Sequence, residues 1–228
     1  MASWKLFGGT DPTKVAGPSS AVVIGLGRFG SSLALELMAS GTEVLGVGGN
    51  EEVVQEHNGL LTHVVRADST REASLRQLNV QDFPHAVVAI GSDIQANILT
   101  SSLMVSMGVA DIWAKAVSDA HGAILDQIGV HHVVYPEKDM GRRVAHLVRG
   151  RMQDFVDIGD GFALVRTKPQ ERYCGKPLGS TDLRRQHGVT VVGVKPAGQG
   201  WRSAEAGTIL QPEDIVLVTG PKAVLEDF

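Results

Sequence analysis

Three glycines with the spacing of a phosphate-binding turn predict the clearest chemistry in this sequence. Gly25, Gly27 and Gly30 follow the apolar run 21–24 and open an amphipathic stretch. In such a turn the first glycine lets the chain reverse, the second lets a phosphate approach the backbone, and the third lets the helix pack on the strand. The amides that begin the helix then face the anion. We therefore predict that this turn binds the phosphates of a nucleotide.

Arg28 and Phe29 lie inside the same turn. Backbone amides alone can hold a diphosphate, so a guanidinium at Arg28 suggests additional terminal negative charge, such as the γ-phosphate of ATP. The alternative for Arg28 is a place on the helix surface. We assign both residues to the predicted nucleotide site.

The second apolar run, 44–47, does not end in the residue that a dinucleotide site usually needs. A ribose-binding carboxylate is expected about 20 residues after the glycines, but the run ends in Gly48, Gly49 and Asn50. The missing carboxylate makes NAD less favoured, and the missing arginine does the same for NADP. The affinity for ATP or ADP depends less on this carboxylate, because their phosphates supply much of the binding energy. Asn50 can still hydrogen-bond a ribose hydroxyl or a base edge, so we include it in the site.

Other polar residues follow apolar runs, and ligands of open α/β sheets bind at the carboxyl ends of the strands. Asp68 and Ser69 face the adenosine in one interpretation and begin a helix in the other. Lys115 ends an apolar run, and we expect its charge to point into the cleft. Glu137 either caps a helix or faces the phosphates, in which case a Mg²⁺ or Ca²⁺ ion must lie between the two anions.

The elements that position these residues alternate between strand and helix. Helical periodicity is clear at 29–39, where Phe29, Leu33 and Leu37 recur on one face. The predicted strands are 21–24, 44–47, 63–67, 86–90, 112–116 and 133–135. This alternation is typical of an α/β fold with a Rossmann-like, doubly wound parallel sheet of about six strands.

The pattern changes after a helix expected from Glu137 to about residue 151, and the remainder predicts a small α+β domain at the carboxy terminus. Its expected elements are the strands 162–165, 190–194 and 215–219 and one short helix at 182–186. The predicted divisions are a flexible tail at 1–20, a nucleotide-binding domain at 21–151 that includes the helix, and a carboxy-terminal domain at 152–228.

Composition narrows the classes of function. The 228 residues carry a net charge of −4, which argues against nucleic acid as the main partner, because phosphate binding needs a basic surface. The single cysteine, Cys174, fits a reducing compartment. No apolar run approaches the roughly 20 residues of a transmembrane helix, and no signal-peptide pattern is present. No catalytic triad or carboxylate pair is evident, so we expect a soluble, cytoplasmic protein that is not an enzyme.

Several segments together resemble the cytosolic KtrA and TrkA regulatory subunits of bacterial potassium uptake systems, from about Ala21 to the end of the chain. The motifs that carry the resemblance are Gly-Leu-Gly-Arg-Phe-Gly at 25–30, Gly-Ser-Asp-Ile-Gln-Ala-Asn at 91–97, Ile-Trp-Ala-Lys-Ala at 112–116, Ile-Gly at 128–129, Pro-Glu-Lys-Asp-Met-Gly at 136–141 and Leu-Gln-Pro-Glu-Asp at 210–214. The resemblance implies an amino-terminal and a carboxy-terminal RCK domain, named for the regulation of K⁺ conductance.

The resemblance also implies dimers assembled into a homo-octameric ring beneath a membrane-embedded transporter subunit of the KtrB/TrkH type, at the inner face of the cell membrane. ATP and ADP would stabilise different ring shapes, with Arg28 at the terminal phosphate and Glu137 helping to hold a divalent cation. Gly48 stands where such proteins commonly have the ribose-binding Asp. Some relatives bind cyclic di-AMP between carboxy-terminal domains, and Arg184 is the contact that this would imply here.

Three hypotheses about function stay open at this point. The first is a regulatory subunit that responds to ATP and ADP and gates a potassium transporter. The second is a small NAD(P)-dependent oxidoreductase, which the same glycine motif would serve. The third is a regulatory subunit controlled mainly by cyclic di-AMP, with a degenerate nucleotide pocket.

Overall fold

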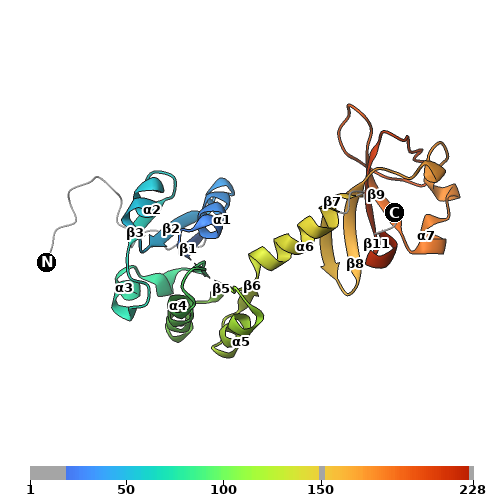
Figure 1. The fold of residues 1–228 in the computed structure, drawn as a ribbon. Coiled ribbons are helices and arrows are strands. Elements are labelled where there is room, and N and C mark those ends of the chain that lie inside the picture. The colour runs from blue at the N-terminus through green and yellow to red at the C-terminus, as the bar shows by residue number, and fades with distance from the viewer. Residues whose placement is uncertain (1–18, 149–151, 226–228) are drawn as a thin grey trace. The chain divides into compact units, whose positions relative to one another are not determined.

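The computed structural model describes residues 19–148 and 152–225 of the chain. The chain divides between Glu137 and Lys138 into two compact units, each with its own sheet (Figure 1). The expected tail at 1–20 lies outside the described residues except for its last two, and Ser20 already belongs to the first strand. The predicted domain boundary at residue 151 follows the helix that begins at Pro136, whereas the two compact units divide within this helix. The boundary at residue 151 stays a prediction.

The first unit contains a parallel sheet, as predicted from the apolar runs. Within the described residues its six strands are β1 (Ser20–Ile24), β2 (Glu43–Gly48), β3 (His63–Arg66), β4 (His85–Val88), β5 (Asp111–Lys115) and β6 (His132–Val134). They pair in the order β3-β2-β1-β4-β5-β6, and every neighbouring pair is parallel. The order reverses between β1 and β4, and at such a switch point a crevice opens at the carboxyl edge.

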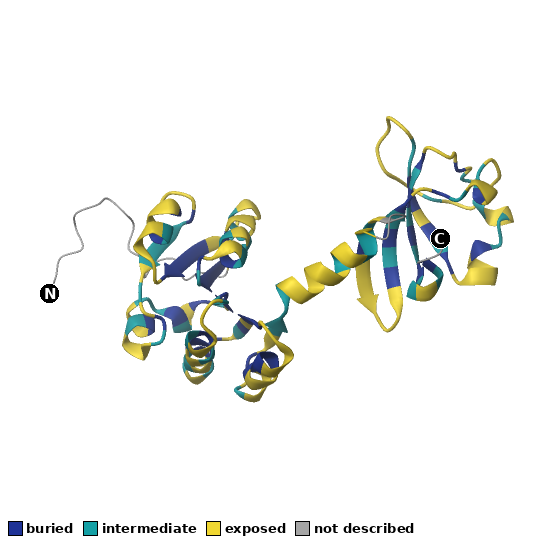
Figure 2. Ribbon diagram, viewed as in Figure 1, coloured by how far each residue is buried: buried dark blue, intermediate teal, exposed yellow. Residues whose placement is uncertain are grey.

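Helices cover both faces of this sheet (Figures 1 and 2). The helices of this unit are α1 (Arg28–Ala39), α2 (Glu51–Glu56), α3 (Glu72–Gln77), the 3₁₀ turn η2 (Val80–Asp82), α4 (Ile94–Ser106) and α5 (Asp119–Gln127). The helix α6 (Pro136–Val148) begins in this unit and continues into the second one. Successive residues of β1 point to opposite faces. Val23 packs with Ala34 of α1, whereas Val22 and Ile24 pack with Met104 of α4. The fully buried strands explain why the sequence shows continuous apolar runs.

The second unit is an antiparallel sheet with short helices, which confirms the small α+β domain. Its described elements are β7 (Met152–Gly159), β8 (Phe162–Thr167), η3 (Glu171–Tyr173), η4 (Leu178–Ser180), α7 (Leu183–His187), β9 (Thr190–Lys195), β10 (Arg202–Ser203), β11 (Ile215–Pro221) and α8 (Lys222–Leu225). The sheet order is β10-β9-β11-β8-β7. Val165, Val194 and Val216 lie in its buried core. No helix in the described part of the chain is long and apolar enough to cross a membrane.

Two features of this unit correct the sequence-based expectation. A single short helix was expected, but α8 follows β11 as a second one. The strand β7 was not expected, because it lies at the sheet edge, pairs only with β8 and has two register irregularities that break the alternation of side chains. Phe155 is buried, but Val156, Asp157 and Ile158 after it are all exposed. Asp154 at the irregular start is held by Arg143, whose Nη2 lies 2.7 Å from Oδ1.

Candidate functional site

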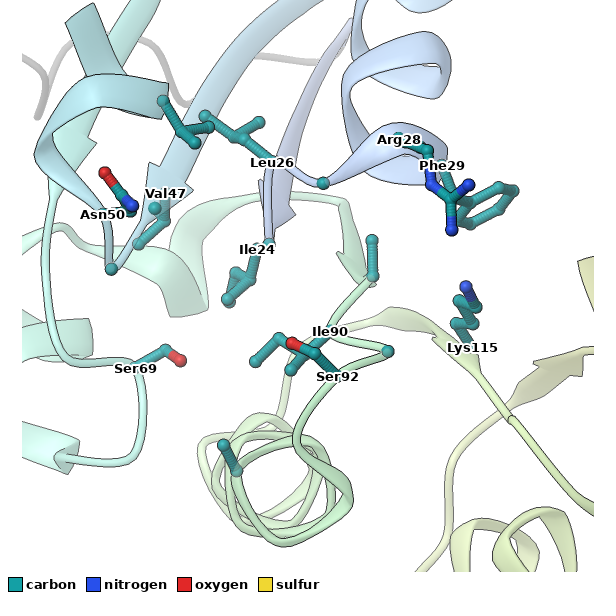
Figure 3. Close-up of a pocket in the computed structure, with 18 of the residues that line it drawn as sticks. Ile24, Leu26, Arg28, Phe29, Val47, Asn50, Ser69, Ile90, Ser92 and Lys115 are labelled. Carbon is teal, nitrogen blue, oxygen red and sulfur yellow. The ribbon is translucent and has the colours of Figure 1, made fainter.

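A cavity of about 1050 Å³ lies at the carboxyl ends of the parallel strands. Its walls come from the turn after β1, the ends of β2 and β3, the loop after β4, the end of β5 and the start of α6 (Figure 3). Its volume is at the upper end of the range of about 300–1,000 Å³ that small-molecule pockets occupy. The cavity therefore lies where a sheet of this topology binds its ligand.

The glycine turn forms one wall of the cavity, and its glycines serve different purposes. Gly25 has φ +97°, and a Cβ on Gly30 would lie 1.9 Å from the carbonyl oxygen of Gly25. Both positions therefore need glycine for the fold itself. A Cβ on Gly27 would meet no atom within 4 Å. Gly27 is also the N-cap of α1 and offers no side-chain cap, so the first amides of this 12-residue helix are left for an anion.

Arg28, Lys115 and Glu137 gather at one end of the cavity. Lys115 is only 8% exposed, and its Nζ lies 2.5 Å from Oε1 of Glu137 and 5.8 Å from the ring centroid of Phe29. A side chain on Gly91 would occupy the same space, because its Cβ would lie 2.9 Å from this Nζ. Figure 3 shows the Arg28 and Lys115 side chains pointing toward one another across this end. The structure thus brings the predicted phosphate-binding cations together.

The electrostatics of this end favour a bound anion. The hydrogen bond from Lys115 is the main cause that lowers the pKa of Glu137. Burial opposes it, and the charges of Lys115 and Arg28 add to the lowering. Glu137 is thus ionised near neutral pH and balances the buried ammonium group of Lys115. A phosphate that enters between Arg28 and Lys115 must compete with this carboxylate for the lysine.

Asn97 of α4 holds the strand ends that carry these groups. Its side chain is fully buried, and Nδ2 donates hydrogen bonds to the carbonyl oxygens of Ile90 (2.7 Å) and Lys115 (3.0 Å). A buried amide with two carbonyl partners fixes the ends of β4 and β5 relative to one another. Asn97 belongs to the 91–97 motif but was not among the predicted site residues. Its side chain contacts backbone carbonyl groups and does not line the cavity.

The three residues predicted at the adenosine end all line the cavity. Each also makes a hydrogen bond within the protein. Oδ1 of Asn50 accepts from the amide of Glu52 (2.8 Å) and caps α2. The Ser69 hydroxyl lies 3.0 Å from that of Thr100. Hydrogen bonds from Thr70 lower the pKa of Asp68. Nucleotide contacts from these side chains stay predictions.

Arg66 is a cavity residue that the sequence-based prediction missed. It ends β3 and is the cross-strand partner of Gly48 in β2. Its Nε donates to the carbonyl oxygen of Gly49 (3.2 Å), and its Nη1 lies 3.3 Å from Oε2 of Glu51. The end of β2 itself carries no arginine, as the sequence shows, but Arg66 of the neighbouring strand lies beside it. The signal was present, since Arg66 follows an apolar strand in the same way as Lys115.

Arg184 and the predicted cation at Glu137 are not joined to a preformed site. Arg184 lies exposed on α7 in the second unit. Among the described residues, no three His, Cys, Asp or Glu side chains are arranged to hold a metal ion. Mg²⁺ is usually held by one or two carboxylates together with waters and the phosphates of a substrate, and Glu137 would supply one such carboxylate. The cation stays a prediction, as does cyclic di-AMP at Arg184.

Comparison with known proteins gives matches along most of the chain. The sequence model of the TrkA-N domain matches residues 21–136, and that of the TrkA-C domain matches residues 162–228. The chain is 37% identical over 207 residues to the Ktr system potassium uptake protein C of Bacillus subtilis, which covers 90% of this chain and 94% of that protein. It is 34% identical over 207 residues to the Ktr system potassium uptake protein A of the same organism, with 90% and 93% covered.

The fold is also similar to that of a solved channel structure. The GsuK channel bound to NAD superposes with a TM-score of 0.63 at 17% sequence identity. The match covers 91% of this chain but only 38% of the channel chain. At this level of identity the likeness concerns the fold.

Proposed function

The chain belongs to the family of proteins that join a TrkA-N domain to a TrkA-C domain, and on that premise we propose that it is a nucleotide-binding regulatory subunit of a membrane potassium transporter. The observation that carries the proposal is the cavity at the switch point of the sheet, where the uncapped start of α1, Arg28 and Lys115 meet. The Ktr names of two relatives that match over 90% of the chain support the transporter as the system that it serves.

We assign ATP and ADP as the ligands, with NAD(H) as a less favoured one. The residues assigned to the phosphates are Gly25, Gly27, Arg28, Phe29, Gly30 and Lys115, and those assigned to the adenosine are Asn50, Asp68 and Ser69. The support for this assignment is the end of the cavity where the guanidinium group of Arg28 and the ammonium group of Lys115 point toward one another, since a terminal phosphate gains charge-assisted hydrogen bonds there. No hydrolysis step is needed for regulation by these ligands.

The Lys115–Glu137 ion pair supplies a difference between the two nucleotides. ADP leaves Lys115 paired with Glu137, whereas the γ-phosphate of ATP competes for the same ammonium group and releases the carboxylate. Glu137 is the second residue of α6, the helix that continues into the second unit. A ligand shifts a conformational equilibrium only through different affinities for the two states, and this exchange provides such a difference. A cation at the released carboxylate is an addition that no step requires.

We further propose that the chain forms dimers that assemble into a homo-octameric ring, located in the cytoplasm against a membrane partner of the KtrB/TrkH type. Met140, Val144 and Val148 of α6 are 53%, 45% and 79% exposed and follow one another at four-residue spacing. Such a stripe forms one apolar face of a helix, and a second copy of this chain is the occupant that we assign to it. Light scattering of the Val144→Glu variant should show a smaller mass than the wild-type chain. A monomeric wild-type chain would contradict the ring.

Calorimetric titration of the full chain with ATP, ADP and NADH tests the nucleotide proposal. Arg28→Gln should weaken ATP binding about tenfold or more and ADP binding less, because the guanidinium is assigned to the terminal phosphate. Arg76→Gln is the matched control, since Arg76 is paired with Glu72 outside the cavity. Failure of both ATP and ADP to bind would reject the proposal. Hydride transfer from NADH to carbonyl compounds would favour the oxidoreductase.

Cyclic di-AMP is tested separately with the same full chain. If the second unit binds it through Arg184, Arg184→Gln should weaken the binding and leave the affinity for ATP unchanged. Arg185→Gln is a useful comparison, because Arg185 is held by Asp182 at 2.9 Å on the same short helix. Absence of cyclic di-AMP binding to the wild-type chain would exclude cyclic di-AMP as a ligand.

A further inference from the structure

The ribose end of the cavity combines a missing carboxylate with an added guanidinium. Gly48 stands at the end of β2, where a dinucleotide site carries the acid that binds the ribose 2′-hydroxyl. Arg66 is its partner in the parallel register and lines the same cavity. Sites that accept a 2′-phosphate replace the acid with a nearby arginine, because an anion must not face a carboxylate.

We propose that the ribose end of the cavity binds a phosphate on the ribose 2′-oxygen of an adenine nucleotide, as in NADP(H), in addition to the ligands assigned above, and that Arg66 is the residue that recognises it. This inference rests on the proposed function, since it concerns the ligand of the same nucleotide site. Gly48 and Arg66 create this recognition of the 2′-phosphate together. The nucleotide acts here as a bound regulator, and no redox step is involved.

The hydrogen bonds of Arg66 position its guanidinium at the ribose end. The bond from Nε to the carbonyl oxygen of Gly49 ties the side chain to the turn after β2. Nη1 contacts Glu51, but both side chains are more than half exposed, at 62% and 57%. Ion pairs of this exposure contribute little, so a phosphate can replace the carboxylate of Glu51. A guanidinium can bind such a phosphate through two parallel hydrogen bonds.

The other acid at this end does not oppose a phosphate strongly. Asp68 lines the cavity, but its Oδ1 accepts hydrogen bonds from the hydroxyl (2.6 Å) and the amide (3.0 Å) of Thr70. Its Oδ2 lies 3.2 Å from Nε of Arg71. These partners already balance the Asp68 charge.

The cavity also has two cationic groups on strands that lie far apart in the sheet, β3 and β5. Arg66 ends β3, whereas Lys115 ends β5, and β2, β1 and β4 lie between them. Four strand spacings of about 4.8 Å separate the two strand axes by about 19 Å. A nucleotide that carries a 2′-phosphate as well as its 5′-phosphates therefore meets a cationic side chain at both of these strands.

The test compares small probes that differ only in the ribose phosphate. Adenosine 2′,5′-bisphosphate, adenosine 3′,5′-bisphosphate and AMP are titrated into the full chain by calorimetry, followed by NADPH and NADH. We expect the 2′,5′-bisphosphate to bind at least about tenfold more tightly than AMP, as hydrogen bonds between charged groups allow. Arg66→Gln should remove this advantage and leave the affinity for AMP unchanged, whereas Arg76→Gln, an equal change of charge outside the cavity, should keep it.

A second variant tests the same idea in the opposite direction. Gly48→Asp restores the usual acid, at the cost of a small shift of Val54, whose Cγ2 would lie 3.0 Å from the new Cβ. This variant should favour AMP and NADH over the 2′-phosphorylated probes. Equal affinities for AMP and the 2′,5′-bisphosphate in the wild-type chain would overturn the inference and leave the proposed function intact. A preference for the 3′,5′-bisphosphate, or an advantage that survives Arg66→Gln, would also overturn it. Binding of none of the nucleotides would overturn both proposals.

Discussion

The competition between Glu137 and a phosphate for Lys115 predicts that removing the carboxylate strengthens ATP binding. In Glu137→Gln the ammonium group no longer has an anionic partner at 2.5 Å, so the γ-phosphate of ATP need not displace one. The Glu137 side chain is 67% exposed, and solvent screening limits such a pair to about 0.2–1 kcal/mol. The dissociation constant for ATP should therefore fall by up to about fivefold, while that for ADP should change less.

The assay is calorimetry in the presence of EDTA, so that no divalent cation bridges Glu137 and the phosphates. Glu72→Gln is the matched control, because Glu72 is also an ion-paired carboxylate but lies outside the cavity. Lys115→Met should act in the opposite direction and weaken ATP binding by roughly 1.5–3 kcal/mol, the worth of a hydrogen bond between charged groups. Weaker ATP binding by Glu137→Gln in EDTA would refute the competition, and with it the exchange that distinguishes ATP from ADP.

Three further predictions concern folding as well as binding. Gly30→Ala should lower the unfolding free energy by about 1–3 kcal/mol in urea denaturation, since the new Cβ has no room. Gly27→Ala should keep wild-type stability and lose ATP affinity. Equal stability of the two variants would contradict the roles given to these glycines. Asn97→Ala should cost about 2–4 kcal/mol, because two buried carbonyl groups lose their donor, and a cost below about 0.5 kcal/mol would show that the strand ends do not depend on it. Burial raises the pKa of Asp154, but the hydrogen bonds from Arg143 and from the amide of Phe155 outweigh it and hold the pKa below its ordinary value of 3.8. Because the native pKa is lowered, the Asp154 carboxylate stabilises the fold above pH 3.8, and this stabilisation is lost as the pH falls through the native pKa. Asp154→Asn should therefore flatten the pH dependence of the unfolding free energy below about pH 3.8. An unchanged slope would contradict this prediction.

The parallel sheet and the phosphate end of the site could be predicted because their signals are local. A strand that is buried on both faces must be apolar throughout, so β1 and β4 stand out, and Gly25 to Gly30 follow directly. Lys115 was found by the same reasoning, as a charge that ends an apolar strand. Its partner Glu137 is 22 residues away, and only the pairing of β5 with β6 brings the two together.

The parts that were missed depend on contacts between segments or on edges. β7 is an edge strand whose register breaks twice, so its side chains do not alternate between buried and exposed. Arg66 was overlooked because the ribose position was sought on β2, where Gly48 lies, although the parallel register places the end of β3 beside it. Asn97 acts through backbone carbonyls, which carry no sequence information.

We propose above all that this chain reports the nucleotide state of the cell to a potassium transporter. The most direct measurement is potassium flux into vesicles that contain the membrane transporter that co-purifies with the chain, with the chain loaded with either ATP or ADP. We predict different fluxes for the two nucleotides with the wild-type chain, and equal fluxes with Lys115→Met. Equal fluxes in ATP and ADP with the wild-type chain would contradict the claim.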